Sequence, residues 1–228
     1  MMTAVGVNNL KTFISSRLEK QIINLELLPG TKLSEIRVAK MFNCSRTPVR
    51  DAFYELRVKG FLESRPQVST FVSKIDLNRV EEVRFIRESV EIAVLRPGIE
   101  KDMFTSQLPL IQANISGMKN TYDKKDMRLF TELDIMFHNI LYNAVGKGFV
   151  QNYAGDNDVH YSRIRFMVTR RKENMIRTIK EHQCIFDLIK SSGSTKGVNE
   201  LISTHLNNIY NYVDNMSPDY NKLFEGSM

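Results

Sequence analysis

The sequence predicts a mostly α-helical protein that carries a small two-stranded β element in its first third. Apolar residues recur at helical spacing along most of the chain, beginning with Leu10, Ile14 and Leu18. Two short stretches, residues 62–64 and 70–73, have instead the length and composition of strands. With 42% hydrophobic and 25% charged residues, the chain has the composition of an ordinary soluble globular protein.

Residues 1–75 are expected to form one domain, in which three helices precede the strands. The helices are recognised by apolar spacing and the turns by Pro, Gly and Asn. Its elements, in order, are a helix over about 9–25, a turn at 28–30, a helix over 36–42, a tight turn at 43–44, a helix over 48–59 and a β hairpin, or wing, with its tip at 65–68.

The start of the third helix concentrates side chains that bind DNA. Ser45 can cap this helix with its hydroxyl group, and Pro48 fits the first turn, where its missing N–H costs nothing. Arg46, Thr47 and Arg50 then surround a helix amino terminus whose free N–H groups already attract phosphate. An arginine at such a position can contact guanine in the major groove through two hydrogen bonds. A short helix, a tight turn and a helix with a basic start are the layout of a DNA-reading helix-turn-helix.

The excess positive charge lies in the same segment. Residues 1–75 contain 12 Lys and Arg against 6 Asp and Glu, whereas residues 76–228 contain 20 of each. The whole formal charge of +6 therefore accompanies the helix-turn-helix, which indicates a polyanionic partner. Arg37 in the second helix is expected to reach phosphate, and Arg65 is expected to supply charge at the wing tip.

Several motif blocks of this segment occur together in a known family. In chain order, Pro29-Gly30, Leu33-Ser34-Glu35, the run Ser45 to Arg50, Gly60-Phe61-Leu62-Glu63 and Phe71-Val72 resemble the winged-helix domain of the GntR family of bacterial transcription regulators. The resemblance implies binding to a double-stranded DNA operator, with Arg46, Thr47 and Arg50 at positions where the family contacts DNA. Many relatives carry arginine at the position of Ile36 and glycine just before the Phe-Val pair, so these departures leave the preferred operator sequence open.

From residue 76 to residue 228 the sequence predicts a second domain, an all-α bundle. Its helices are separated by Pro97-Gly98, by the turn at 146–148 and by the turn at 191–194. The polar end, residues 217–228, is expected to fray. The six predicted helices cover about 79–96, 103–121, 126–145, 149–169, 172–191 and 195–215.

Four side chains of the bundle can converge in its interior. Asp134 and His138 are four residues apart on one predicted helix and therefore share a face. His182 and His205 lie on two further helices. One carboxylate and three imidazoles suit a divalent transition metal such as Zn, Ni, Fe or Mn. The spacing by itself favours the alternative, a surface pair or a helix-stabilising contact between Asp134 and His138.

A second resemblance supports the metal interpretation. Residues 132–138 and 143–146, with Glu181-His182 and Thr204-His205-Leu206, resemble the FCD domain, the ligand-binding half of FadR-type GntR regulators. In many members of that family the equivalent aspartate and three histidines form a metal site. The resemblance therefore implies a divalent transition metal held by Asp134, His138, His182 and His205.

The same site is expected to bind a small carboxylate effector. A dication beside one carboxylate leaves a local charge of about +1 and open positions for oxygen ligands. Arg87 begins the Arg-x-x-x-Glu pattern of the family and is expected to bind the carboxylate, with Arg165 and His160 also in the effector site. An ordinary ion pair is the alternative for each arginine. Arg163 is expected to face solvent, and Cys184 to be a small buried residue that points away from the site.

These features together predict a homodimeric, effector-responsive repressor that reads an inverted repeat with one helix-turn-helix per half. Two distant cysteines make disulfides unexpected and a reducing cytoplasm the expected location. No apolar run approaches the ~20 residues of a membrane helix, so no membrane partner is expected. An enzyme is not expected, because the metal histidines are not followed by a candidate general base. Two alternatives stay open: a metalloenzyme-like helical domain fused to the winged helix, and a metal-free dimerisation module.

Overall fold

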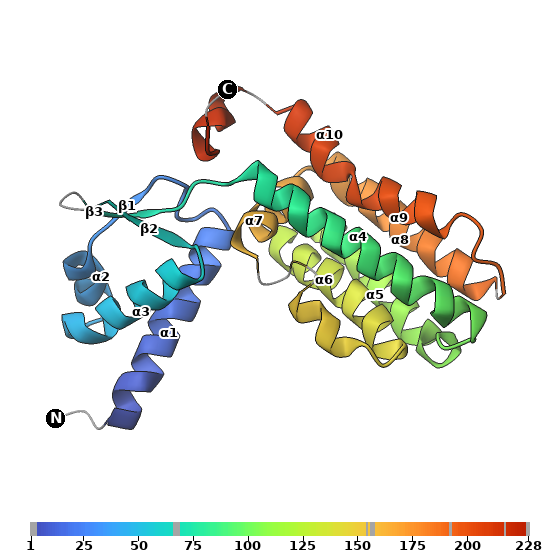
Figure 1. Ribbon diagram of the computed structural model, residues 1–228, viewed down its shortest axis with the longest axis horizontal. Helices are drawn as coiled ribbons and strands as arrows, with labels where there is room; N and C mark the ends of the chain where they lie inside the picture. The colour runs from blue at the N-terminus through green and yellow to red at the C-terminus, as the bar shows by residue number, and fades with distance from the viewer. Residues whose placement is uncertain are drawn as a thin grey trace. The chain divides into compact units, whose positions relative to one another are not determined.

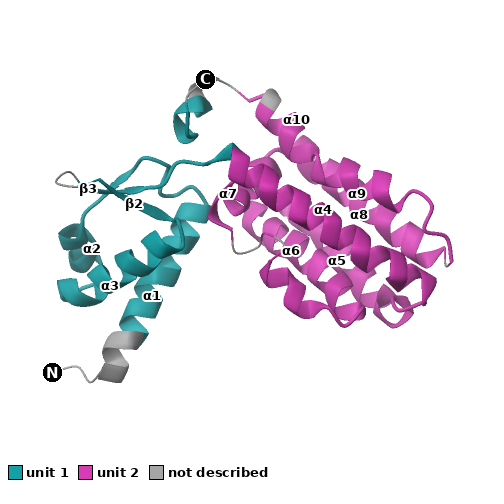
Figure 2. Cartoon of the chain, in the orientation of Figure 1, with its two compact units in different colours: residues 1–77, 217–228 teal, residues 78–216 magenta. Residues whose placement is uncertain are grey.

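Two compact units make up the chain. The computed structural model describes residues 4–65, 69–153, 155, 158–191, 193–216 and 218–226. Residue contacts place residues 1–77 and 217–228 in a first unit and residues 78–216 in a second (Figures 1 and 2). The predicted fold class is confirmed, since helices dominate and the described strands form one small antiparallel sheet. No helix in the described part of the chain is long and apolar enough to cross a membrane.

The first unit combines three helices with a small sheet. In chain order its elements are α1 (Ala4–Ile23), β1 (Lys32–Leu33), α2 (Glu35–Met41), α3 (Arg46–Val58), β2 (Leu62–Arg65) and β3 (Ser69–Val72). β3 lies between β1 and β2, is antiparallel to both, and pairs Leu33 with Thr70 and Glu63 with Phe71. α1 packs on α3, and the buried apolar side chains of these two helices include Ile14, Leu18, Ile22, Val49, Phe53 and Leu56.

The predicted order of helices and wing strands is confirmed in this unit, with differences at the boundaries. α1 ends at Ile23, before the predicted end at 25, because Leu25 has a left-handed backbone with φ 56°. β1 was not predicted, since a strand of two residues has no alternating pattern to detect. The predicted wing tip includes residues 66–68, which lie outside the described residues.

The end of the chain packs into the first unit. After η3, a 3-10 helix (Pro218–Leu223), Phe224 pairs with Ile75 in a parallel bridge. The Ile75 N–H donates to the Leu223 carbonyl at 2.9 Å, and the Glu225 N–H donates to the Ile75 carbonyl at 2.9 Å. The expectation that residues 217–228 fray is wrong for the described part of this segment, because Leu223 and Phe224 are buried.

The second unit is a bundle of helices that encloses a continuous apolar core. The fully buried core residues include Ile111, Ile115, Phe130, Phe137 and Ile185. In chain order its elements are α4 (Leu77–Glu100), η1 (Thr105–Gln107), α5 (Leu108–Lys124), α6 (Met127–Ala144), η2 (Gly148–Asn152), α7 (Val159–Thr169), α8 (Lys172–Lys190), α9 (Val198–Leu206) and α10 (Asn208–Asp214).

The helix break predicted at Pro97-Gly98 is wrong, because α4 continues through both residues to Glu100. A proline removes one N–H donor from a helix but leaves its own carbonyl available. Here the Lys101 N–H donates to the Pro97 carbonyl at 3.0 Å, so the helical turn closes after the proline.

Two other predicted helices are each divided in the structure. The predicted helix over 149–169 consists of η2 and α7, and α7 starts only where Asp158 caps it by accepting the N–H groups of His160 and Tyr161, both at 3.0 Å. The predicted helix over 195–215 is divided into α9 and α10 at Asn207. The second break matters for the site described below, because α10 contributes to its wall.

Glu55 of α3 makes two ion pairs, one with Lys11 of α1 and one with Lys59 at the end of α3, and removing its charge should destabilise the first unit. Its carboxylate lies 2.8 Å from Lys11 Nζ and 2.9 Å from Lys59 Nζ, and these two partners lower the pKa of Glu55 to about 2. A lowered folded-state pKa contributes stability above the ordinary value near 4.5, and this contribution is lost as pH falls towards 2. We expect Glu55→Gln to lower the free energy of unfolding by about 1 kcal/mol at pH 7 and by less at pH 3.

Denaturant titrations at the two pH values check this prediction. Glu63→Gln is the matched control, because the ion pair of Glu63 lies within the wing, with Arg65 Nη2 at 2.9 Å, and does not join two helices. An equal loss of stability for Glu55→Gln at pH 7 and pH 3 would contradict the ionic explanation.

Candidate functional site

The DNA-reading residues predicted on α3 form one exposed cluster. Ser45 is the N-cap residue of α3 with an extended backbone, but its hydroxyl group accepts no hydrogen bond from the helix, so the expected side-chain cap is wrong. Arg46 and Thr47 are the first two helical residues. Arg46, Thr47 and Arg50 are exposed and line a hollow together with Glu35, the first residue of α2. The Arg46 Nη2 group donates to Glu35 Oε2 at 3.1 Å. The start of α2 therefore orients the arginine at the start of α3.

Arg37 and Arg65 lie apart from this cluster. Arg37 is exposed on α2 and borders a different hollow, between α1, β1 and α2. Arg65 ends β2, where its Nη2 group donates to Glu63 Oε1 at 2.9 Å and its guanidinium lies over the Phe71 ring at 4.8 Å. Glu63 and Phe71 thus orient the Arg65 guanidinium on the wing, while Arg37 offers a separate positive charge on α2.

In the second unit, the four predicted metal ligands come together. Asp134 and His138 project from α6, His182 from α8 and His205 from α9, and one potential ligand atom of each lies within 4.8 Å of the others. All four side chains are buried. The predicted convergence of these residues is confirmed, and the alternative of a surface pair between Asp134 and His138 is wrong.

The imidazole rings turn the same nitrogen towards the centre of the cluster. His138 Nε2 lies 3.3 Å from His205 Nε2, and His182 Nε2 lies 3.4 Å from Asp134 Oδ1. Phe137 stacks on the His182 ring at a centroid distance of 3.7 Å and fixes the plane of this ring. Three Nε2 atoms and one carboxylate oxygen thus face a common point.

The outward nitrogens of the rings contact groups that orient them. His205 Nδ1 is hydrogen-bonded to Glu181 Oε2 at 2.8 Å, whereas His138 Nδ1 lies 3.2 Å from Glu91 Oε1 without the geometry of a hydrogen bond. A ring that donates its Nδ1 proton to a carboxylate presents the Nε2 lone pair on its other side, which is the usual arrangement of a metal-binding histidine. His182 Nδ1 contacts a sulfur atom instead of a carboxylate, with Met118 Sδ at 3.3 Å.

Arg165 balances the charge of the buried carboxylate. Its Nε group donates to Asp134 Oδ2 at 2.7 Å. Burial alone would raise the pKa of the Asp134 carboxyl, but Arg165 and the nearby imidazoles hold this pKa well below its usual range. Burial, opposed by Glu91, lowers the pKa of His138 to about 4, and burial lowers the pKa of His182 well below its usual value. His138 and His182 are therefore uncharged at neutral pH, the form in which imidazole binds metals.

These residues fit a divalent transition metal. The buried His182 Nε2 atom has no hydrogen-bond partner among the described residues, and the Nε2 atoms of His138 and His205 lie 3.3 Å apart, so that if both rings carry their proton on Nδ1 two lone pairs face each other. A cation at the centre would relieve both conditions. Ligand atoms about 2.1 Å from an ion lie at most about 4.2 Å apart, so a slight contraction of the observed 4.8 Å suffices.

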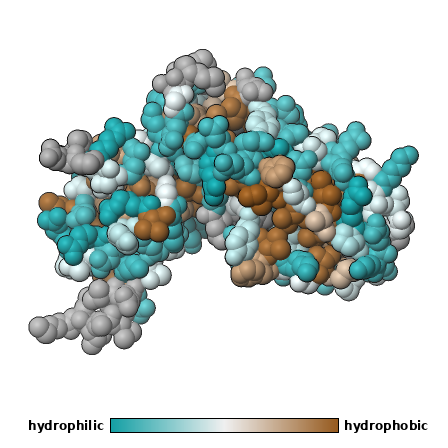
Figure 3. All heavy atoms as spheres, viewed as in Figure 1, coloured by the Kyte–Doolittle hydropathy of each residue, from teal (hydrophilic) through white to brown (hydrophobic). Residues whose placement is uncertain are grey.

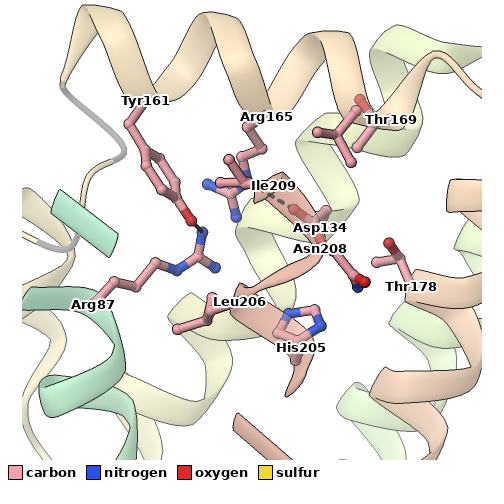
Figure 4. A pocket seen from close by; sticks show the side chains of 11 residues that line it. Arg87, Asp134, Tyr161, Arg165, Thr169, Thr178, His205, Leu206, Asn208 and Ile209 are labelled. Carbon is pink, nitrogen blue, oxygen red and sulfur yellow. Dashed lines mark hydrogen bonds and ion pairs between the residues drawn. The ribbon is translucent and has the colours of Figure 1, made fainter. Parts of the chain in front are cut away.

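A small cavity of about 40 Å³ adjoins the cluster (Figure 4). Asp134 and His205 form part of its wall, and the guanidinium groups of Arg87 and Arg165 converge on it. The Arg87 Nη1 group donates to Tyr161 Oη at 3.1 Å, and its Nε group donates to Glu91 Oε1 at 2.7 Å. The other lining residues are Val168, Thr169, Thr178, Leu206, Asn208 and Ile209.

Two predicted effector residues line this cavity, and one does not. Arg87 and Arg165 are part of the wall, each already in an ion pair, whereas His160 is absent from it. His160 is half-buried, and its Nδ1 atom lies 3.3 Å from Arg163 Nη2. The expectation that Arg163 faces solvent is wrong, since its Nε group donates to the Val159 carbonyl at 3.0 Å and the side chain has no exposed surface. Cys184 points away from the cluster but is exposed on α8, not buried as predicted.

Three supporting residues were not predicted from the sequence. Glu91 is the final residue of the Arg-x-x-x-Glu pattern, so the pattern marks it but does not reveal that it faces His138. Glu181 precedes His182 yet supports His205, and α10 adds Asn208, whose Nδ2 group donates to Glu181 Oε1 at 2.8 Å. Neither contact follows from sequence spacing, because each depends on how α8 packs against α9 and α10.

Two family sequence models match the chain in the regions that hold these sites. Residues 10–72 match the bacterial regulatory proteins of the gntR family, and residues 82–208 match the FCD domain. The first match contains the cluster at the start of α3. The second contains all four predicted metal ligands.

Similar proteins agree with both matches. The chain is 30% identical over 193 residues to the HTH-type transcriptional repressor RspR of Escherichia coli strain K12, which covers 84% of this chain and 83% of that protein. It is 28% identical over 211 residues to an uncharacterised HTH-type transcriptional regulator of Streptomyces ambofaciens, with 91% and 86% covered. The solved structure of E. coli McbR/YncC shares the fold, with a TM-score of 0.68 and 16% identity over 92% of this chain and 99% of that one. The chain therefore belongs to the GntR family of bacterial regulatory proteins, and it is a DNA-binding transcription regulator with a ligand-binding C-terminal FCD domain.

Proposed function

We propose that this regulator responds to a small carboxylate effector bound beside a divalent transition metal, Zn, Ni, Fe or Mn, in its FCD domain. The observation that carries the proposal is the convergence of Asp134 and three imidazoles on one point next to a cavity that two arginines border. The residues that would hold the metal are Asp134, His138, His182 and His205.

The chain's own residues define what each part of the site does. When bound, a divalent ion supplies positive charge and coordination positions for oxygen ligands. Arg165 keeps the Asp134 carboxylate ionised and oriented, and Glu181 orients the His205 ring. These contacts orient the ligand side chains before an ion binds, so that little rearrangement of the site accompanies metal binding.

The cavity favours a small anion. Its volume of about 40 Å³ corresponds to about three water molecules, which limits the bound part of an effector to a few atoms. Arg87 is held by Glu91 and Tyr161 with its guanidinium on the cavity wall, a suitable position for pairing with a carboxylate. Thr178 and Asn208 add polar groups to the same wall.

We further propose that the protein acts in the cytoplasm as a homodimeric repressor on an inverted-repeat operator. One α3 helix reads one half-site, so a second subunit is needed for the other half. Exposed apolar side chains on α4, including Phe85 and Ile86, offer a surface for association, and Figure 3 shows hydrophobic residues gathered on one face of the second unit. The repressor named RspR supports the negative sense of regulation. An effector changes operator binding only if it binds the DNA-competent and incompetent states with different affinity.

Two alternative functions can be distinguished from the proposed one by experiment. A metalloenzyme-like bundle would turn over a substrate at the metal site, with activity that depends on Asp134 and His138. A metal-free dimerisation module would keep any effector response when these two ligands are replaced. The buried, carboxylate-oriented rings favour the metal-dependent regulator over the second of these.

Arg46→Ala should weaken specific DNA binding. The lost contact to a guanine edge should cost about 1–3 kcal/mol in binding free energy. The measurement is the Kd for a duplex that the wild-type protein selects from random-sequence DNA, at fixed salt concentration. Arg57→Ala, in the last turn of α3, is the matched control and should change the Kd little. An operator affinity that Arg46→Ala leaves unchanged would refute the assignment of this residue.

Asp134→Ala/His138→Ala should abolish metal binding. The wild-type protein, purified without a tag, should contain about one transition-metal ion per chain by elemental analysis, because four ligands form one site. His160→Ala is the matched control, since this histidine lies outside the cluster, and it should retain the metal. Equal metal content in all three proteins would place the metal elsewhere.

Glu181→Gln should weaken the metal site without removing a ligand. Replacement of a group that orients a metal-binding histidine typically reduces metal affinity about 10- to 100-fold. Competition with a chromophoric chelator measures this change. Glu132→Gln, which removes an exposed carboxylate on α6, should leave the affinity unchanged. If Glu181→Gln binds metal as tightly as the wild type, the contact with His205 has no role in the site.

A further inference from the structure

The second unit is joined to the DNA-binding unit by two chain crossings. The chain passes from the first unit to the second after residue 77 and returns after residue 216. The returning segment, residues 218–226, is called the C-terminal strap here. The strap and its partner Ile75 lie outside both family matches, which cover residues 10–72 and 82–208.

The strap is docked through backbone and side chains. Two hydrogen bonds of 2.9 Å join it to Ile75, one from the Ile75 N–H to Leu223 and one from the Glu225 N–H to Ile75. Ile75 has no exposed surface, and Leu223 and Phe224 are 4% and 5% exposed. This degree of burial marks the strap as part of the fold of the first unit.

Ile75 lies close in sequence to the sheet of the DNA-binding unit. It follows β3 by three residues, and between them the Ser73 N–H donates to the Phe61 carbonyl at 3.0 Å, next to β2. The Ser73 hydroxyl donates to the Gly60 carbonyl at 2.7 Å, at the end of α3. The strap therefore pairs with a segment that is hydrogen-bonded to the end of the DNA-reading helix.

At its other end the strap is connected to α10, the helix that contributes to the proposed effector site. α10 begins at Asn208, whose Nδ2 group donates to both carboxylate oxygens of Glu181, and Glu181 in turn contacts the predicted metal ligand His205 at 2.8 Å. Asn208 and Ile209 line the cavity. Tyr210 Oη accepts from Arg84 Nε at 3.3 Å, which links α10 to α4, the helix of the first crossing. Both crossings thus start from helices that contribute to the cavity wall.

We propose that the C-terminal strap is a coupling element that transmits the position of α10 to the DNA-binding unit. This inference rests on the proposed function, because the occupant of the cavity is what would set the position of α10. A displacement at the start of α10 strengthens or weakens the docking of the strap. The bridge to Ile75 then transmits this displacement to the segment that connects β3 with α4. A strap of fixed length is essential to this coupling, whereas a longer one would stay docked and transmit nothing.

A double-mutant cycle on the full chain tests the strap without any effector. Asn208→Ala loosens the start of α10, and a flexible Gly/Ser segment inserted after Met216 lengthens the connection to the strap. The same segment inserted after Gly193, in the turn between α8 and α9, is the matched control. Hydrogen exchange at the Ile75 and Glu225 amides, which both donate in the bridge, reports docking. The Kd for a duplex selected from random DNA by the wild-type protein reports function.

We expect Asn208→Ala to raise the exchange rates of both amides several-fold and to change the Kd. The same changes are expected when Asn208→Ala is combined with the control insertion after Gly193. With the strap lengthened, Asn208→Ala should alter neither quantity. The inference is overturned if Asn208→Ala leaves the bridge unaffected, or if its effect persists with the lengthened strap. Addition of Zn²⁺ in a separate experiment tests the proposed function. If Zn²⁺ does not slow hydrogen exchange in α6 and α8, the metal site is refuted. The double-mutant cycle with Asn208→Ala decides the role of the strap in either case.

Discussion

The burial of a charged carboxylate inside an apolar bundle is the constraint on which the site depends. A desolvated charge and desolvated lone pairs destabilise a fold unless partners compensate them. Arg165 compensates Asp134 through a contact of 2.7 Å. The three imidazoles add lone pairs at the same point, and in the described part of the chain His182 Nε2 has no hydrogen-bond partner. A divalent cation would satisfy all of these groups together, which is the physical basis of the proposed metal site.

The residues of this cluster also connect several helices of the bundle. The ligands come from α6, α8 and α9, and the supporting carboxylates come from α4 and α8. An ion bound by such a set fixes the relative positions of the helices that hold it. The cavity beside it is bordered by α4, α6, α7, α8, α9 and α10, so an effector there would contact the same elements. Under the proposed function, binding of a ligand here would favour one arrangement of these helices over another.

The sequence predicted the order of most elements and the convergence of the four candidate ligands, but not the contacts that support them. Helical spacing placed Asp134 and His138 on one face, and apolar spacing and turns located α2 and α3, because these are properties of neighbouring residues. The contact between Glu181 and His205 joins residues 24 positions apart, and its geometry exists only once α8 and α9 pack together. The strap was missed for the same reason, since the burial of Leu223 depends on a partner surface far away in the sequence.

The claim that the buried cluster is a metal centre is tested most directly by X-ray absorption spectroscopy of the Zn²⁺-loaded protein. The account predicts nitrogen and oxygen neighbours about 2.0–2.2 Å from the metal. It also predicts the outer scattering of three imidazole rings, from His138, His182 and His205. Sulfur neighbours at about 2.3 Å, or scattering from no more than a single imidazole, would contradict it.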